Sequence, residues 1–167
     1  MLFQDTIVAL ATPPLTSALA LIRVSGNQTY PLLAKVFSRP LPAGKAPALL
    51  VGRIMDKTQV VDEVVLSCFF APKSYTGEDV VEISCHGNMY IVHRIVALLV
   101  EHGARLAEKG EFTKRAFYNG KMDLVQAESI HDVIEANTHT AVDMALQGII
   151  GKTSQPLLAM RQSLQQL

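Results

Sequence analysis

The amino-acid sequence predicts an α+β protein, in which a mixed or antiparallel sheet with packed helices is followed by a long helical segment. Short β-prone runs bounded by turn residues occupy much of the first part of the chain. Two stretches among them, 27–37 and 87–102, instead place apolar residues at helical spacing. From Asp123 onward the spacing is helical throughout. We therefore expect one domain over residues 1–121 and the start of a helical domain over residues 122–167.

Composition and charge restrict the class of protein. Of the 167 residues, 49% are apolar and 18% are charged, which excludes a disordered chain. The 15 basic and 15 acidic side chains cancel, which argues against a chain that binds nucleic acid by itself. Residues 1–121 carry 13 Lys/Arg and 10 Asp/Glu, whereas residues 122–167 carry 2 and 5. This change in charge supports a boundary near residue 121.

Cysteine content and the N-terminus indicate the compartment. Cys68 and Cys85 are too few for a disulfide framework and lie in strand-like runs, so we expect two reduced core thiols. The first residues, MLFQD, lack the basic region of a signal peptide. No apolar run approaches the roughly 18 residues that a membrane span requires. We therefore expect a soluble cytoplasmic protein that does not engage a membrane.

The first elements follow from β-prone runs and helix signals. Strands are expected at 6–11 and 18–24, the second being apolar except for one arginine. Asn27 is expected to cap a helix over 27–37, in which Pro31 is tolerated because it falls near the first turn.

The middle of the chain predicts three further strands. After a proline-rich loop at 38–48, strands are expected at 49–55 and 60–70, joined by a tight turn. A further strand is expected at 79–86 after a loop. Alternation along it places Val81, Ile83 and Cys85 on one face and Val80, Glu82, Ser84 and His86 on the other.

Two helices and an edge strand are expected between the last long strand and the helical region. We expect a helix over 87–102 that stops at Gly103, an edge strand at 104–107, and a short helix over 110–119 that Gly120 closes.

The helical region is too long for a compact globule. A continuous helix over 123–167 would measure about 66 Å at 1.5 Å per residue, whereas a compact chain of this size is only about 40 Å across. It must therefore fold back or project towards a partner, and we expect it to be poorly stabilised alone. Gly151 and Pro156 mark possible bends, and Ser154 is a possible cap. The lack of a stop signal at Leu167 indicates the N-terminal piece of a larger protein.

Two charged side chains in apolar strands are the first candidate site. A buried charge requires a partner, and Glu82 is the obvious partner of Arg23. One interpretation is an ion pair that only stabilises the fold. The other is a pocket, because a carboxylate that faces adjacent N–H and NH₂ groups holds the edge of a guanine-like or pterin ring.

Two motifs add candidates. SYTGED at 74–79 is a turn that feeds the strand carrying Glu82, with Gly77 supplying conformational freedom. GEFTKRAFYNGKMDL at 110–124 combines a short helix, a glycine stop and the cap of the long helical region. Lys121 lies at that junction, where it either reaches a ligand or is a solvated surface lysine.

Several ordered motifs together resemble one known family. They are DTIVA at 5–9, ATPP at 11–14, RVSG at 23–26, YTGED at 75–79, CHG at 85–87 and GEFTKRAFYNGKMDLVQAE at 110–128. At this spacing they resemble the N-terminal part of the bacterial tRNA modification GTPases of the MnmE (TrmE) family. The resemblance covers nearly the whole chain.

The resemblance implies a fold similar to folate-binding one-carbon-transfer domains, and homodimerisation through residues 1–121. It implies that 5-formyl- or 5,10-methylene-tetrahydrofolate contacts Arg23, Glu82 and Lys121. In our interpretation Glu82 takes the pterin N–H edge, and the two cations take carbonyl or anionic groups. No catalytic residue and no metal ligand is assigned.

Members of this family insert a GTPase domain, with GTP, Mg²⁺ and K⁺, into the helical domain. With a flavin-dependent partner of the MnmG type they modify the wobble uridine of tRNA, using a folate-derived one-carbon unit. Nothing here matches the GTP phosphate loop, so we expect no GTP hydrolysis by this chain alone. The alternatives are a structural dimerisation module, in which Arg23 and Glu82 only stabilise the fold, and a free-standing aminomethyltransferase-like enzyme. The second is disfavoured because no substrate domain follows.

Overall fold

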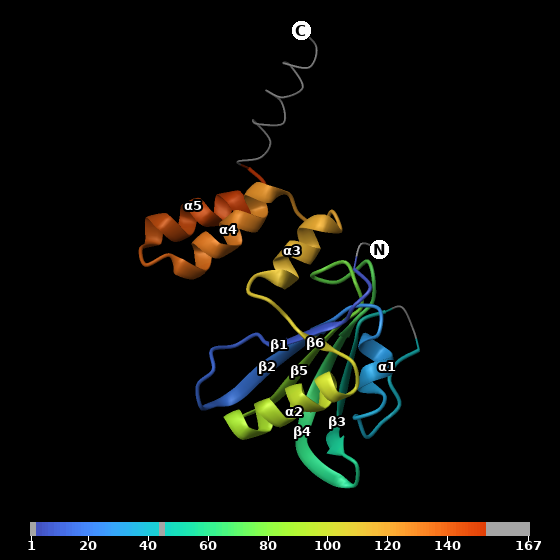
Figure 1. Ribbon diagram of the computed structural model, residues 1–167. Helices are drawn as coiled ribbons and strands as arrows, with labels where there is room; N and C mark the ends of the chain where they lie inside the picture. The colour runs from blue at the N-terminus through green and yellow to red at the C-terminus, as the bar shows by residue number, and fades with distance from the viewer. Residues whose placement is uncertain (1–2, 44–45, 153–167) are drawn as a thin grey trace. The chain divides into compact units, whose positions relative to one another are not determined.

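The computed structural model describes residues 3–43 and 46–152. The chain divides into two compact units, Met1–Arg115 and Ala116–Leu167. The first unit combines a mixed six-stranded sheet with helices, which confirms the predicted α+β class (Figure 1). None of the helices in the described part is both long and apolar enough to span a membrane.

The sheet has the strand order β3-β4-β5-β2-β1-β6. Its strands are β1 (Ile7–Leu10), β2 (Ser17–Ser25), β3 (Ala48–Asp56), β4 (Gln59–Phe69), β5 (Val80–Gly87) and β6 (Arg105–Leu106). All neighbours are antiparallel except β1 and β6, which are parallel. Every predicted strand is confirmed, including the edge strand β6.

One face of the sheet forms the core with helices α1 (Thr29–Leu33) and α2 (Met89–Glu101) (Figure 1). Ile22, Ile83 and Leu66 are register partners on β2, β5 and β4, and all three are fully buried. The predicted alternation of β5 is confirmed, since Val81, Ile83 and Cys85 lie in this core. Val80 is also buried, although its side chain belongs to the opposite set.

The other face of the sheet exposes apolar side chains at alternate positions of the strands. These side chains are Leu19, Leu49, Val51 and Val65. Val51 and Val65 are cross-strand partners, and Val65 also pairs with Ser84 of β5. This exposed face carries Glu82 and Arg23 as well, because side chains two residues apart point to the same side of a strand.

The helix predicted over 27–37 is wrong in extent, since α1 covers only Thr29–Leu33. Its N-cap, Gln28, makes no side-chain cap hydrogen bond. After the helix, the Val36 carbonyl accepts a hydrogen bond from the Met55 amide at 2.7 Å, and Phe37 forms a β-bridge with Ile54. The chain leaves the helix early because it covers the edge strand β3, whose backbone groups would otherwise lack partners.

The helix and turn signals around α2 are confirmed. Asn88 caps α2 by accepting a hydrogen bond from the Tyr90 amide at 2.9 Å. The chain leaves the helix at Gly103, whose φ of +111° favours glycine. The short helix α3 (Glu111–Tyr118) follows, beginning in the first unit and ending in the second.

The second unit contains a pair of helices, α4 (Leu124–Glu135) and α5 (His139–Ile149), which run side by side (Figure 1). The helical region therefore folds back, as one of our two expectations required, but it does so at 136–138, a break that the sequence did not predict. The bend expected at Gly151 is confirmed, since α5 ends just before this glycine, whose φ is +78°. Thr138 starts the second helix by accepting a hydrogen bond from the Ala141 amide. The possible bend at Pro156 and cap at Ser154 lie outside the described residues.

Close packing holds α4 against α5. A Cβ atom added to Gly148 would lie only 2.0 Å from Ser129 Oγ, so only glycine fits beside this serine. At the start of α4, Asp123 and Gln126 form a capping box. The helix pair is thus defined by one glycine contact and two good N-caps.

Candidate functional site

Arg23 and Glu82 meet on the exposed face of the sheet. They are register partners on the antiparallel strands β2 and β5. Arg23 donates from Nε at 2.9 Å and from Nη2 at 2.7 Å, and both bonds go to Glu82 Oε1. Each side chain is 21% exposed. The predicted pairing is therefore confirmed, and the pair remains accessible to solvent.

The second carboxylate oxygen of Glu82 is available. Within the described residues, Oε2 accepts no hydrogen bond from a protein group. The two hydrogen bonds that Arg23 donates to Oε1 fix the orientation of the carboxylate. It can therefore accept hydrogen bonds from a ligand at Oε2.

Two aromatic rings lie beside the Arg23 guanidinium. Its Cζ atom is 4.8 Å from the ring centroid of Tyr75 and 5.5 Å from that of Phe112. The Tyr75 hydroxyl and Thr113 Oγ1 share a hydrogen bond of 2.8 Å. The site therefore combines a carboxylate, a guanidinium and flat apolar surfaces, which suits a planar ring with N–H groups along one edge.

The 74–79 loop that supplies Tyr75 is fixed by its own polar side chains. Ser74 Oγ donates to the Glu78 carbonyl at 2.5 Å, and Gly77 has a φ of +79°, as expected for a turn glycine. Thr76 Oγ1 shares a hydrogen bond of 2.7 Å with Ser25 Oγ on β2. The loop is therefore attached directly to the strand that carries Arg23.

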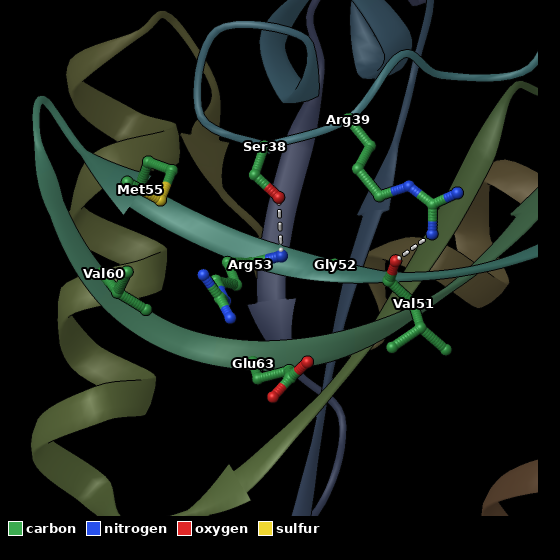
Figure 2. A pocket seen from close by; sticks show the side chains of 8 residues that line it. All are labelled: Ser38, Arg39, Val51, Gly52, Arg53, Met55, Val60 and Glu63. Carbon is green, nitrogen blue, oxygen red and sulfur yellow. Dashed lines mark hydrogen bonds between the residues drawn. The ribbon is translucent and has the colours of Figure 1, made fainter.

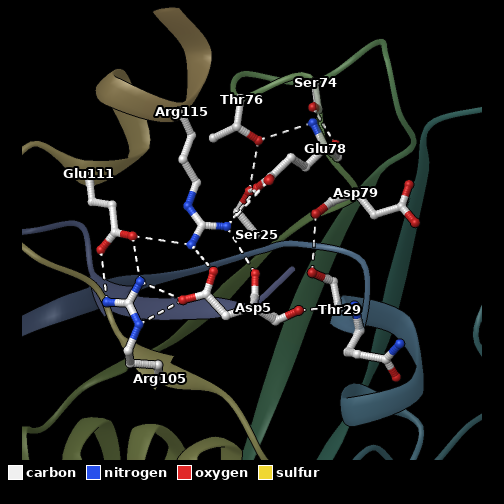
Figure 3. Close-up of polar contacts among 12 residues, drawn as sticks. Asp5, Ser25, Thr29, Ser74, Thr76, Glu78, Asp79, Arg105, Glu111 and Arg115 are labelled. Atoms are coloured by element: carbon white, nitrogen blue, oxygen red, sulfur yellow. Dashed lines mark hydrogen bonds and ion pairs between the residues drawn. The ribbon is translucent and has the colours of Figure 1, made fainter. Parts of the chain in front are cut away.

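A buried cluster of charges lies next to this loop (Figure 3). Arg115 is fully buried and donates from Nη1 to both oxygens of Glu78 at 3.3 Å. Its Nη2 donates to Asp5 at 2.7 Å and to Glu111 at 3.1 Å. Ser25 Oγ donates to Glu78 Oε2 at 2.7 Å. The cluster ties α3 to the loop, to β2 and to the segment before β1.

Local sequence patterns do not predict this cluster. Its charged residues lie in a loop, in a polar helix and just before β1, where charges usually face solvent. The spacing of Glu111 and Arg115, which matches one helical turn, was the only available signal.

The cluster strongly favours ionised carboxylates. Hydrogen bonds from Arg105 lower the pKa of Glu111 to about 2. Burial alone would raise the pKa of Asp5, but hydrogen bonds from Arg105 and Arg115 lower it overall. These carboxylates therefore carry charge at neutral pH.

Lys121 belongs to the second compact unit. Its backbone amide donates to the Ala116 carbonyl at 2.9 Å, in the turn that ends α3. The structure thus brings together two of the three predicted site residues, Arg23 and Glu82. A role of Lys121 in binding a cofactor stays a prediction.

Cys85 and His86 do not form a catalytic pair, as the strand alternation predicts. Cys85 is buried, and burial raises the pKa of its thiol to about 11. His86 is exposed on the opposite face, and its Nδ1 lies 2.7 Å from Oδ1 of the buried Asp62. Asp62 also accepts a hydrogen bond from the His86 amide at 2.8 Å. We interpret this pair as local support for the strand.

A separate pocket of about 510 Å³ lies at the β3 edge of the sheet (Figure 2). Arg39 donates from Nη1 to the Val51 carbonyl at 2.7 Å, and Ser38 Oγ accepts a hydrogen bond from the Arg53 amide at 2.9 Å. These bonds occupy backbone groups of the edge strand. The side chains of Arg39 and Ser38 beside this pocket therefore protect the edge strand from pairing with another chain. None of the residues predicted to bind a ligand lines the pocket.

Comparisons with known proteins identify the family to which the chain belongs. The family profile described as the N-terminus of the GTP-binding protein TrmE matches residues 6–121. A "tRNA modification GTPase MnmE" of Flavobacterium psychrophilum is 44% identical over 168 residues, which cover 98% of this chain and 36% of the relative. Relatives of the same name from Enterococcus faecalis and Cytophaga hutchinsonii are each 45% identical, cover 96% of this chain, and are themselves covered to 36% and 35%. The chain thus spans about a third of the length of these relatives, and it belongs to the TrmE (MnmE) family, to whose N-terminal part it corresponds.

Proposed function

We propose that this chain is the tetrahydrofolate-binding and dimerisation module of a tRNA modification GTPase that acts on the wobble uridine of tRNA. Membership in the TrmE family supports this proposal. The observation that carries it is the partly exposed Arg23–Glu82 pair, in which one carboxylate oxygen is still available for a ligand. In this role the bound folate supplies a one-carbon unit.

The residues present suit the chemistry of a reduced pterin. Glu82 Oε2 accepts hydrogen bonds from adjacent N–H and NH₂ groups of the ring. Arg23 orients the carboxylate and attracts carbonyl or anionic groups of the ligand. The rings of Tyr75 and Phe112 provide flat apolar surfaces beside the pair. We propose that Lys121 adds a further cationic contact and that the ligand is 5-formyl- or 5,10-methylene-tetrahydrofolate.

We propose that residues 1–121 form a homodimer through the exposed face of the sheet. That face carries Leu49, Val51 and Val65, and Leu49 is 73% exposed. Contiguous apolar surface of this kind on a folded domain marks an interaction site. Sedimentation of the wild-type chain should give a dimer, and Val51→Lys should give a monomer with unchanged secondary structure. A monomeric wild-type chain at high micromolar concentration would contradict this part of the proposal.

The wider setting of the proposal comes from the family. The whole protein would use GTP with Mg²⁺ and K⁺, a flavin-dependent partner of the MnmG type, and tRNA, in the cytoplasm. This chain alone should neither bind nor hydrolyse GTP. Incubation with GTP should therefore release no phosphate above the buffer control.

Direct titration tests the ligand. Calorimetry with 5-formyltetrahydrofolate should show saturable binding to the wild-type chain. A matched titration with p-aminobenzoylglutamate, which lacks the pterin ring, should show at least tenfold weaker binding, a difference of about 1.4 kcal/mol. Equal affinity for both compounds would show that the pterin is not the group recognised, and no binding of either would overturn the proposal.

A structural role of Arg23 and Glu82 is the second candidate. It is favoured by the two short hydrogen bonds that Arg23 donates to Glu82 without any ligand. That role predicts no folate binding by the wild-type chain and a clear loss of melting temperature when either partner is replaced. The titration and a thermal melt of Glu82→Gln separate the two candidates.

A further inference from the structure

Two aromatic rings, as well as the salt bridge to Glu82, restrict the position of the Arg23 guanidinium. Tyr75 and Phe112 both lie within cation–π distance of its Cζ atom, at 4.8 and 5.5 Å. An arginine side chain has many rotamers, and neighbours that restrict them reduce the entropy lost when a ligand binds. The position of these two rings therefore bears on ligand affinity.

The two rings come from different segments, and one hydrogen bond joins those segments. Tyr75 lies in the 74–79 loop, whereas Phe112 lies in the first turn of α3. The bond of 2.8 Å between the Tyr75 hydroxyl and Thr113 Oγ1 links the loop to the helix. Because Thr113 follows Phe112 directly, this bond fixes the rings relative to each other.

The buried cluster supplies a rigid base for that link (Figure 3). Arg115 of α3 and Glu78 of the loop are both fully buried and paired at 3.3 Å. Ser25 bonds to Glu78 and lies two residues after Arg23, on the same side of β2. Helix, loop and strand are thus joined below the Arg23 site, and the Tyr75–Thr113 bond joins them beside it.

We infer that Thr113 is a positioning residue for the ligand site: its hydroxyl holds Tyr75, and with it Phe112, against Arg23, so that Glu82 keeps its free oxygen available to a pterin ring. This inference rests on the proposed function. Thr113 itself need not touch the ligand. Its loss should therefore weaken binding through a looser Arg23–Glu82 pair.

Calorimetry with 5-formyltetrahydrofolate tests this role in the full chain. Thr113→Val keeps the shape of the side chain and removes the hydroxyl, so affinity should fall by about three- to tenfold, as expected for one neutral hydrogen bond. Thr113→Ser restores the hydroxyl and should bind nearly as the wild type does. Thr140→Val, the same change at an exposed position of α5, is the matched control and should leave affinity unchanged.

A second readout needs no ligand. The Nε–H resonance of Arg23 should shift in Thr113→Val and return to its wild-type position in Thr113→Ser. Tyr75→Phe removes the same hydrogen bond from the other side and should reproduce both effects. It also replaces Thr113→Val if that variant fails to fold.

The outcomes separate this inference from the proposed function. If the wild type binds the folate and both Thr113→Val and Tyr75→Phe bind equally well, the inference is wrong and the proposed function stands. If Thr113→Ser is as weak as Thr113→Val, the hydroxyl is not the positioning group and the inference is again wrong. A wild-type chain without any folate binding would overturn the proposed function and this inference with it.

Discussion

Two arginine–carboxylate pairs in the first unit have the same chemistry and opposite settings. Arg23 and Glu82 lie on the exposed face of the sheet, and each side chain is 21% exposed. Arg115 and Glu78 are both fully buried. Arg115 donates hydrogen bonds to three different carboxylates. Arg23 donates to a single oxygen of one carboxylate. The two pairs therefore differ in how deeply they are buried and in how many hydrogen-bond partners they already have. A buried pair with many partners stabilises the fold, whereas an accessible pair with a free oxygen can accept a ligand.

The energetic difference follows from solvation. Removing one partner from a buried pair leaves a desolvated charge, which costs about 3–5 kcal/mol. A partly exposed pair such as Arg23–Glu82 gains less, because water screens the attraction and replaces the lost partner, and its contribution is about 1 kcal/mol or less.

Replacing the buried arginine should have the largest effect. Arg115→Met should lower the free energy of unfolding by about 3–5 kcal/mol, because Glu78 would remain buried without its partner. Urea denaturation measures this loss. The control is Glu101→Gln, which removes the more exposed carboxylate of the Arg94–Glu101 pair and should lower the free energy of unfolding far less. Equal losses in the two variants would show that burial of Arg115 does not matter.

Acid should lower the stability that the buried cluster provides, with the second-largest effect. The pKa of Glu111 is about 2 in the folded protein, below its ordinary value of 4.5. A lowered folded pKa stabilises the protein above pH 4.5, and this stability is lost as the pH falls from 4.5 towards 2, with an upper bound of about 3 kcal/mol. Unfolding measured between pH 7 and pH 2 should show the loss.

The variant Glu111→Gln isolates that contribution. It should be less stable than the wild type at pH 7, and the difference should shrink as the pH falls. A constant difference between wild type and variant across this range would contradict the lowered pKa.

The exposed pair should have the smallest effect on stability. Glu82→Gln should change the free energy of unfolding by about 1 kcal/mol or less, because both side chains remain in contact with water. A thermal melt of the variant measures this. A loss as large as that of Arg115→Met would favour the structural role of Arg23 and Glu82 over the proposed folate site.

The sequence was sufficient to predict the exposed pair but not the buried one. Arg23 and Glu82 each interrupt an apolar strand, so each is conspicuous, and strand alternation assigns them a face. Glu78 lies in a polar loop and Arg115 in a helix rich in charge, where the local pattern is that of a surface. Only the packing of α3 against the 74–79 loop buries them, and contacts at such separation leave no periodic signal.

The secondary-structure elements likewise divide into those that local sequence patterns predict and those that contacts between distant segments determine. Strands and capped helices followed from local patterns, as did the stop at Gly103. The helix over 27–37 was predicted too long, because covering the edge of β3 overrides local helix preference. The break before Thr138 was missed because the apolar spacing continues across it, although the threonine is itself a good N-cap.

The most direct test of the account is a titration of three chains with 5-formyltetrahydrofolate. The wild type and Glu101→Ala, which breaks a different arginine–glutamate pair on α2, should bind with the same affinity. Glu82→Ala should lose binding altogether while its circular dichroism spectrum and melting temperature stay close to those of the wild type. Unchanged affinity in Glu82→Ala would contradict the account.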